Sequence, residues 1–307
     1  MSDRILLIIS IVATLPLLAV VPVDAQPGGA ATVSEAPRTS WGDPDLRGTW
    51  TNSTTTPMQR PADLEGQEFL SEEEWARRNP GSGLSFAEPT AGNPTGSYND
   101  FWLEKGVLSK RTSLIIEPPN GRYPPPAPEA QARRRAQGAN ASPRPGPASW
   151  VDFGTLGRCL TRSMPGAMQP GFYNHNYQIF QTPHHVAILV EMIHDARIIP
   201  LEGFAEPSPT VTQWMGISRG HWEGDTLVVE TTNLPDPNLT VVERLTRVGP
   251  DAIDYRVTVT NPTRWTAPWT ALMPMATLEG ALFEFACHEG NYALPNMLAG
   301  ARAEETR

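Results

Sequence analysis

The sequence lacks the motifs that mark several common kinds of active site. Its 307 residues include only two cysteines and six histidines. No Cys-x-x-Cys pair, His-Glu-x-x-His run or glycine-rich phosphate loop occurs, so the usual zinc and nucleotide motifs are excluded. No cofactor is therefore predicted. A divalent metal would need about three side chains to converge from distant positions. The candidates are His175, His194, His221, His288 and the carboxylates.

A second apolar run of membrane-spanning length is also missing. The one long run, residues 5–23, follows Arg4, is broken by Pro16 and Pro22, and ends in small residues. A basic start, an apolar middle and a small-residue end predict a secretory signal peptide over residues 1–25. An uncleaved anchor is the alternative. Signal cleavage would leave a periplasmic or secreted protein with no membrane contact.

Positive charge is scarce. The formal net charge is −9 at neutral pH, and the one basic cluster, Arg133 to Arg135, lies in a segment rich in proline and alanine. Nucleic-acid binding depends on clustered lysine and arginine, so no nucleic-acid partner is expected. The expected partner is a small-molecule ligand or substrate. The oligomeric state stays open.

Proline is abundant, with 32 residues, and residues 26–150 combine many of them with few strand-like runs. We expect this part to be a proline-rich extension that wraps the core and carries short helices. A helix over residues 71–78 is indicated by a capping box, in which Ser71 and Glu74 satisfy each other's backbone groups.

Residues 151–307 favour strands. Short alternating runs are separated by turn signals such as Glu223-Gly224-Asp225, with no helix between them long enough for a parallel crossover. The pattern predicts a mainly β domain, an antiparallel barrel or sandwich, with a short C-terminal helix. Upstream, Gly48-Thr49-Trp50 resembles the Gly-x-Trp on the first strand of lipocalin-type (calycin) barrels, which favours the barrel.

Charged side chains interrupt one apolar run. Residues 186–199 are expected to form one strand covered on both faces, with His194 on one face. Glu191, Asp195 and Arg197 alternate along the other face. Buried charge is costly unless it is paired or used, so this row is a candidate site. The alternative is an internal ion-pair network, for which Asp195 and Arg197 are the closest pair.

Residues 281–289 are expected to form the last strand, which would point Cys287 and His288 to opposite faces. That alternation argues against a Cys–His dyad and leaves His288 as a separate acid–base candidate. Cys159 and Cys287 are the only cysteines of an exported chain, so a disulfide between them is predicted. A free buried thiol and a nucleophile are the alternatives.

Several longer stretches resemble a group of exported, β-rich bacterial proteins of uncharacterised function. The stretches include HDARIIPL, WEGDTLVVETTN and FACHEGNY, and they span most of the chain after the signal. The resemblance implies export and a β-rich body. It implies no particular reaction.

The leading hypothesis is an exported β-barrel enzyme that acts on a small apolar or ring-containing molecule. It would be a lyase, isomerase or hydrolase that uses cofactor-independent acid–base chemistry. The catalytic candidates are His194, His288, Glu191, Asp195 and Arg197, and the ligand-lining candidates are Tyr177, His175 and Trp222. The alternative is a non-catalytic carrier or sensor. An enzyme would direct His194 and His288 into a shared cavity, whereas a carrier would not.

Overall fold

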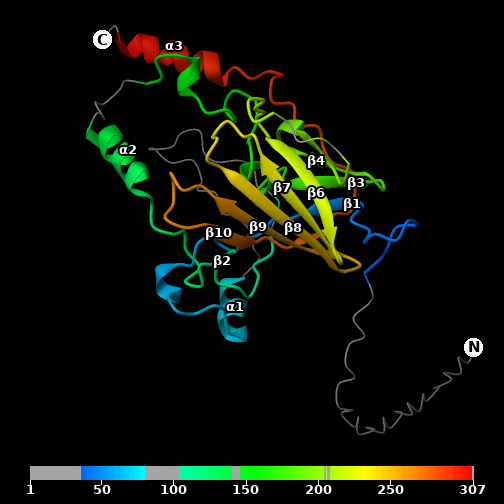
Figure 1. Cartoon of the computed structure of the whole chain (residues 1–307). Coiled ribbons are helices and arrows are strands. Elements are labelled where there is room, and N and C mark those ends of the chain that lie inside the picture. Colours follow the sequence, from blue (N-terminus) through cyan, green and yellow to red (C-terminus); the bar gives the residue numbers. More distant parts are fainter. Residues whose placement is uncertain are drawn as a thin grey trace, which may run out of the picture. The chain divides into compact units, whose positions relative to one another are not determined.

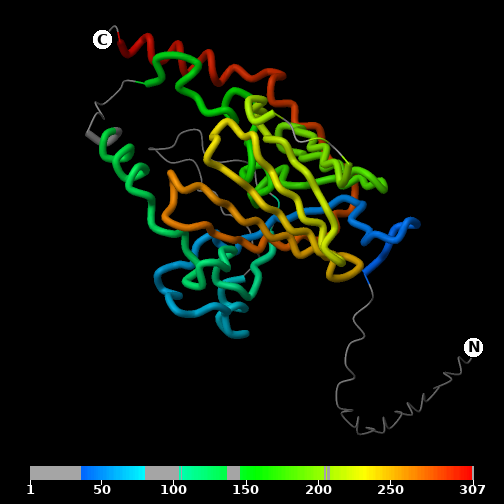
Figure 2. Tube along the Cα trace, in the orientation of Figure 1, coloured from blue at the N-terminus to red at the C-terminus, as the bar shows by residue number. Residues whose placement is uncertain are grey.

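The computed structural model describes residues 36–79, 104, 106–139, 146–203, 205 and 208–305. The signal peptide predicted over residues 1–25 lies outside these residues. Ser34–Arg307 form one compact unit. Its centre is a strongly curved antiparallel sheet, with helices at its margins (Figures 1 and 2).

The sheet has eleven strands, and every pairing between them is antiparallel. Along the main path the strands follow one another as β5 (Ala196–Pro200), β4 (His185–Val190), β3 (Asn176–Gln181), β1 (Gly48–Thr51), β11 (Met275–Thr277), β9 (Ala252–Thr260), β8 (Thr240–Gly249), β7 (Thr226–Thr232) and β6 (Ile217–Glu223). Because the two end strands, β5 and β6, contact each other, the sheet is a nearly closed barrel. The prediction of a mainly β, antiparallel fold is confirmed.

Two short strands come from the proline-rich part of the chain. β1 lies between β3 and β11 in the middle of the sheet. β2 (Ile115–Glu117) pairs with β10 (Trp269–Leu272), which in turn pairs with β9. The described residues of the proline-rich part thus supply two strands of the sheet.

The described residues outside the sheet form the α-helices α1 (Glu72–Arg78), α2 (Pro128–Ala139) and α3 (Ala293–Glu305). The predicted capping box is present at α1, where the Ser71 side chain accepts from the backbone of Glu74 and the Glu74 side chain accepts from that of Ser71. α3 is the expected helix near the C-terminus.

Alternation places large apolar side chains inside the barrel. In β9 the side chains of Ile253, Tyr255, Val257 and Val259 are fully buried, while the residues between them are partly or fully exposed. Burying one such side chain contributes about 1.5–3 kcal/mol. The lumen is thus a packed core.

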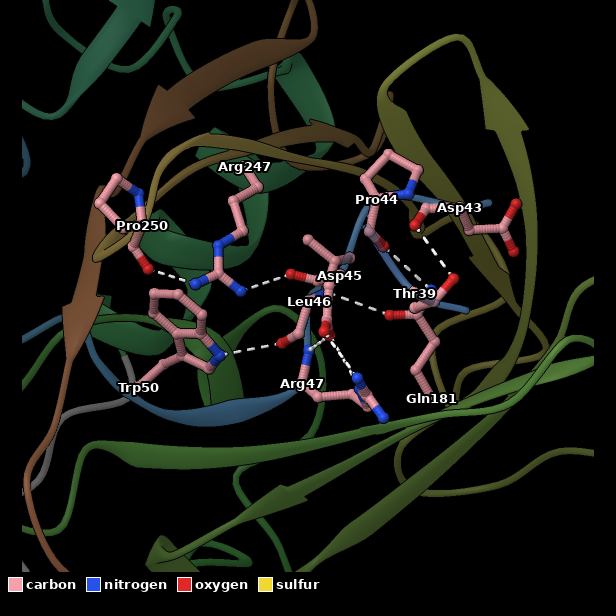
Figure 3. Close-up of polar contacts among 10 residues, drawn as sticks. All are labelled: Thr39, Asp43, Pro44, Asp45, Leu46, Arg47, Trp50, Gln181, Arg247 and Pro250. Carbon is pink, nitrogen blue, oxygen red and sulfur yellow. Dashed lines mark hydrogen bonds and ion pairs between the residues drawn. The ribbon is translucent and has the colours of Figure 1, made fainter. Parts of the chain in front are cut away.

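Polar contacts surround Trp50, the tryptophan of the Gly-x-Trp motif (Figure 3). The indole is fully buried, and its Nε1 donates to the Leu46 carbonyl at 3.0 Å. The Arg247 guanidinium of β8 stacks over the ring, 5.0 Å from its centroid, and donates to the carbonyls of Asp45 and Pro250. Gln181 of β3 holds the same segment, because its side chain bonds the backbone of Leu46. These contacts fasten the entry of β1 to both halves of the sheet.

The prediction of one strand over residues 186–199 is wrong. The chain forms a hairpin, in which β4 and β5 are joined by a tight turn that contains a single 3-10 turn (Met192–His194). Ile193 and His194 adopt positive φ angles of 66° and 50°. Such angles are normally taken by glycine or asparagine, so no turn signal was visible in the sequence.

The prediction of a strand over residues 281–289 is also wrong, since this segment is irregular. Side chains hold its backbone in place of a strand ladder: Glu191 accepts from the Phe283 N–H at 2.7 Å. The predicted disulfide between Cys159 and Cys287 is present, with Cα atoms 5.8 Å apart. It joins this segment to the loop before β3.

Candidate functional site

The two histidines predicted to act as acid and base both lie at the surface. His194 is exposed, and its Nδ1 is 3.3 Å from the Phe285 carbonyl. His288 is exposed in the irregular segment. Neither imidazole lines the pockets described below.

Arg197 does not pair with Asp195. Its side chain enters the lumen and forms two hydrogen bonds with the Glu243 carboxylate, one of them 2.9 Å long. Because β5 and β8 are not neighbouring strands, this pair spans the interior. Tyr255 also donates to Glu243, at 2.7 Å, and Ser218 and Thr231 accept from Arg197. Burial alone would lower the pKa of Arg197, but the adjacent Glu243 carboxylate raises it. Arg197 therefore belongs to an internally paired cluster, in which its Nε lacks a hydrogen-bond partner among the described residues.

Ser218, which accepts from Arg197, also lies in a stretch that matches a catalytic sequence motif. Gly216-Ile217-Ser218-Arg219-Gly220 matches the Gly-x-Ser-x-Gly pattern of nucleophile elbows. An elbow places its serine on a sharp turn between a strand and a helix, where the hydroxyl is exposed. Here Ser218 lies within β6, and its buried hydroxyl is bonded to Thr231 at 2.8 Å. The motif match is therefore structural.

The carboxylates of Asp195 and Glu191 have different hydrogen-bond partners. Asp195 is half-buried and accepts from the Thr161 hydroxyl at 2.9 Å, and burial raises the pKa of its carboxyl group. Glu191 is buried and accepts from the Asn176 amide at 2.7 Å as well as from Phe283. The row of charges expected along one strand is thus divided among three separate environments.

Arg162, which belongs to no sequence motif, lies between a buried histidine and a pocket. Its Nη1 is 2.7 Å from Nε2 of His175, a buried residue. An arginine can only donate, so Nε2 accepts and the imidazole proton resides on Nδ1. Burial, and then the Arg162 charge, lower the pKa of His175 to about 4. His175 is therefore neutral near pH 7 and holds the guanidinium in place.

Glycine is required next to this pair. A Cβ atom on Gly171 would lie 1.8 Å from Nε2 of His175. Arg162 itself is half-buried, and burial lowers its pKa. Within the described part of the chain, no carboxylate lies at ion-pair distance from it. Among the described residues, the guanidinium is thus a partly desolvated cation with no paired carboxylate.

A pocket of about 320 Å³ adjoins Arg162. Its walls are mostly apolar, and they include Met164, Trp214, Leu234, Leu239, Val259 and Trp265. Asp236 and Arg264 also line it, and these two pair with each other at 3.5 Å. Trp265 is fixed by aromatic contacts, since it stacks on Tyr123 at 5.9 Å and meets Trp269 edge-on at 5.8 Å. Ser163, at the pocket's edge, has a φ of 56° and donates to the Trp214 carbonyl at 2.7 Å. Strained positions of this kind cluster at functional sites.

A second, more open pocket of about 630 Å³ adjoins the first. It is lined by Asp195, and the two pockets share Trp214 and Pro235. Thr161 links them, because its hydroxyl bonds Asp195 and the next residue in the chain is Arg162. One cation and one carboxylate with a raised pKa thus face neighbouring spaces.

The other predicted lining residues lie elsewhere. Tyr177 is fully buried, and its hydroxyl is 3.3 Å from Oδ1 of Asn52. Burial raises its pKa. Trp222 is half-buried in β6. Only His175 of the three predicted lining residues reaches the Arg162 pocket, through its contact with that arginine.

Arg162 and Trp214 offered little signal in the sequence, because neither belongs to a motif. Across the described ranges, no group of three or more His, Cys, Asp or Glu side chains could hold a metal ion. In that same part of the chain, no helix has the length and apolar character needed to span a membrane. Comparisons with family models, with curated proteins and with solved structures find no match to this chain.

Proposed function

We propose that the protein binds a small organic anion with an apolar or ring-containing body, as an exported carrier or sensor. The observation that carries the proposal is the half-buried Arg162, which lacks a carboxylate partner among the described residues and lines an apolar pocket. The Cys159–Cys287 disulfide supports export, because disulfides persist in oxidising compartments.

The chemistry of the pocket selects both ends of such a ligand. A guanidinium presents a planar fork that matches a carboxylate, and the bond is stronger where water is partly excluded. Trp214 and Trp265 give flat apolar walls suited to a ring. The volume of about 320 Å³ lies at the lower end of the range for small-molecule sites. A one-ring carboxylate fits this description.

Acid–base catalysis by histidine has no support from this site. The Nε2 lone pair of His175 is engaged by Arg162, while His194 and His288 lie at the surface. Binding without turnover is therefore the preferred function.

The binding function is tested by calorimetry on the full chain, with benzoate as the anionic probe and benzyl alcohol as the neutral one. Arg162→Gln should weaken benzoate binding about 10- to 100-fold, because it removes a charged hydrogen bond. Benzyl alcohol binding should change little. The matched control is Arg158→Gln, since Arg158 stacks on Trp150, outside the pocket. Equal benzoate affinity in both variants would refute the proposal.

Asp195 favours a second candidate, an enzyme that transfers a proton. Its raised pKa suits an acid–base group, and it faces the pocket next to Arg162. Phenylpyruvate, an anion with a ring and acidic C–H groups, is a direct probe. An enzyme would accelerate exchange of the benzylic protons for deuterium above the buffer rate, and Asp195→Asn would abolish the acceleration. Asp225→Asn, at an exposed hairpin tip, is the control. Exchange at the buffer rate with the unaltered protein excludes proton transfer to this probe.

A further inference from the structure

A different pocket, of about 540 Å³, lies beside β1 and β11. Thr51 and Ala276, which are paired across these two strands, both line it. Leu114, Val107, Met275 and Leu278 supply much of the remaining lining. The lining is mainly apolar, and no residue is shared with the Arg162 pocket.

A polar corner interrupts this apolar lining. The Glu104 carboxylate accepts from the Ser53 hydroxyl at 2.6 Å and from the Asn176 amide nitrogen at 2.8 Å. The same amide nitrogen donates to Glu191 at 2.7 Å. A carboxylate accepts hydrogen bonds, so the amide atom of Asn176 that faces Glu104 and Glu191 is its nitrogen. The other amide atom, which faces neither carboxylate, is therefore Oδ1.

That oxygen accepts from no donor of the described residues. Asn176 is only 6% exposed and lines the pocket, yet its buried Oδ1 makes no hydrogen bond within the described residues. An acceptor left unsatisfied in this way costs about 1–3 kcal/mol, so most buried polar atoms have a partner. A ligand that enters the pocket with an N–H or O–H group would supply the missing donor.

The charge at this corner indicates which kind of ligand group would donate to Asn176. Two carboxylates, Glu104 and Glu191, are bridged by one amide, and no lysine, arginine or histidine of the described chain lies at ion-pair distance from either. A cation is favoured over a neutral hydroxyl in such a field, and an anion is disfavoured. A primary ammonium has three donors and no acceptor.

We propose that this pocket is a second ligand site, one that binds an apolar primary amine. The ammonium group donates to Oδ1 of Asn176 and to the Glu104 carboxylate, and the apolar chain lies against Leu114, Val107 and Leu278. The site is independent of the Arg162 pocket, which has the opposite preference for charge.

The test uses n-octylamine, which is protonated at neutral pH, with n-octanol and octanoate as probes of equal chain length. Titration calorimetry on the full-length Arg162→Gln variant, in which the proposed carboxylate site is disabled, should show binding of octylamine, weaker binding of octanol and no binding of octanoate. Glu104→Gln should weaken octylamine binding at least about tenfold and leave octanol nearly unchanged, because it removes charge and keeps a polar group. Equal affinity for the three probes, or no binding of octylamine, would overturn the proposal.

A second variant keeps the test independent of the polar network. Ala276 is exposed and lines the pocket, so Ala276→Phe should fill the space and abolish octylamine binding without burying a new group. Thr277→Phe is the matched control, since Thr277 is the exposed next residue and does not line the pocket. Identical octylamine binding in these two variants contradicts the assignment. Arg162→Gln should leave octylamine binding unchanged, which separates this site from the proposed carboxylate site.

Discussion

The lumen and the Arg162 pocket each contain a desolvated arginine, yet only one of them resembles a binding site. Arg197 is buried, with Glu243 bidentate to it and two hydroxyls accepting from it, while its Nε lacks a hydrogen-bond partner among the described residues. Within the described ranges, Arg162 hydrogen-bonds the neutral His175 and otherwise borders a pocket.

The difference lies in what each charge still needs. In the lumen, the cost of burying the arginine is offset by the opposite charge of Glu243 and by the surrounding hydrogen bonds. Beside the pocket, that compensation is incomplete within the described residues. Buried charge alone therefore does not identify a site, and incomplete pairing is the more informative property.

The largest effect should follow from breaking the lumen pair. Arg197→Met leaves Glu243 buried without its cation and should lower the free energy of unfolding by about 3–5 kcal/mol. The double variant Arg197→Met/Glu243→Leu should recover much of that loss, because it removes both charges. Arg162→Met is the control and should cost about 1–2 kcal/mol, because it leaves Nε2 of the buried His175 without its donor but leaves no charge unpaired. Urea unfolding followed by tryptophan fluorescence measures all three. A large loss for Arg162→Met would show that the two arginines are not different in kind.

The disulfide should have the next largest effect, and mainly on the Arg162 side of the molecule. Replacing both Cys159 and Cys287 by serine opens a link between positions 128 residues apart and should cost about 2–4 kcal/mol. Amide hydrogen exchange should quicken in residues 281–292 and in the loop before Arg162. In β8 and β9, amide exchange should quicken only as much as the loss of global stability requires. Faster exchange spread evenly over the sheet would contradict a local role for the bridge.

Much of the fold could be predicted because its signals are local. The hairpin of β6 and β7 has a glycine turn at Gly224, and α1 has its capping box. The disulfide could be predicted because the sequence contains two cysteines. Each of these inferences depends on residues a few positions apart, or on there being only one way to pair them.

The errors arose where tertiary contacts override local pattern. The turn at Ile193 and His194 lacks glycine and asparagine, so the apolar alternation of β4 continues unbroken into β5. Residues 281–289 alternate as a strand would, but Glu191 and the disulfide hold them in an irregular path. The candidate site was harder to predict than the fold. Arg162 stands out because no carboxylate of the described residues pairs with it, and no sequence pattern records a missing partner.

The smallest of these effects on stability should come from His175, and it depends on pH. Its pKa of about 4 in the folded protein lies below the ordinary value of 6.5, so the unfolded chain takes up the proton first. The stabilisation is complete above about pH 6.5 and declines as the pH falls toward 4, by about 2–3 kcal/mol in all. Asp195, whose pKa is raised, contributes with the opposite sign over the acidic range.

The contribution of His175 is isolated by subtraction. The unfolding free energy of the protein and of His175→Gln is measured from pH 7 to pH 4, and the difference between the two curves should shrink as the pH falls. His184→Gln, at an exposed position, should give a flat difference. If the curve for His175→Gln runs parallel to that of the unaltered protein, His175 does not remain neutral in the fold. It could then no longer accept the hydrogen bond that holds Arg162 toward the pocket, and the contrast between the two arginines would need another cause.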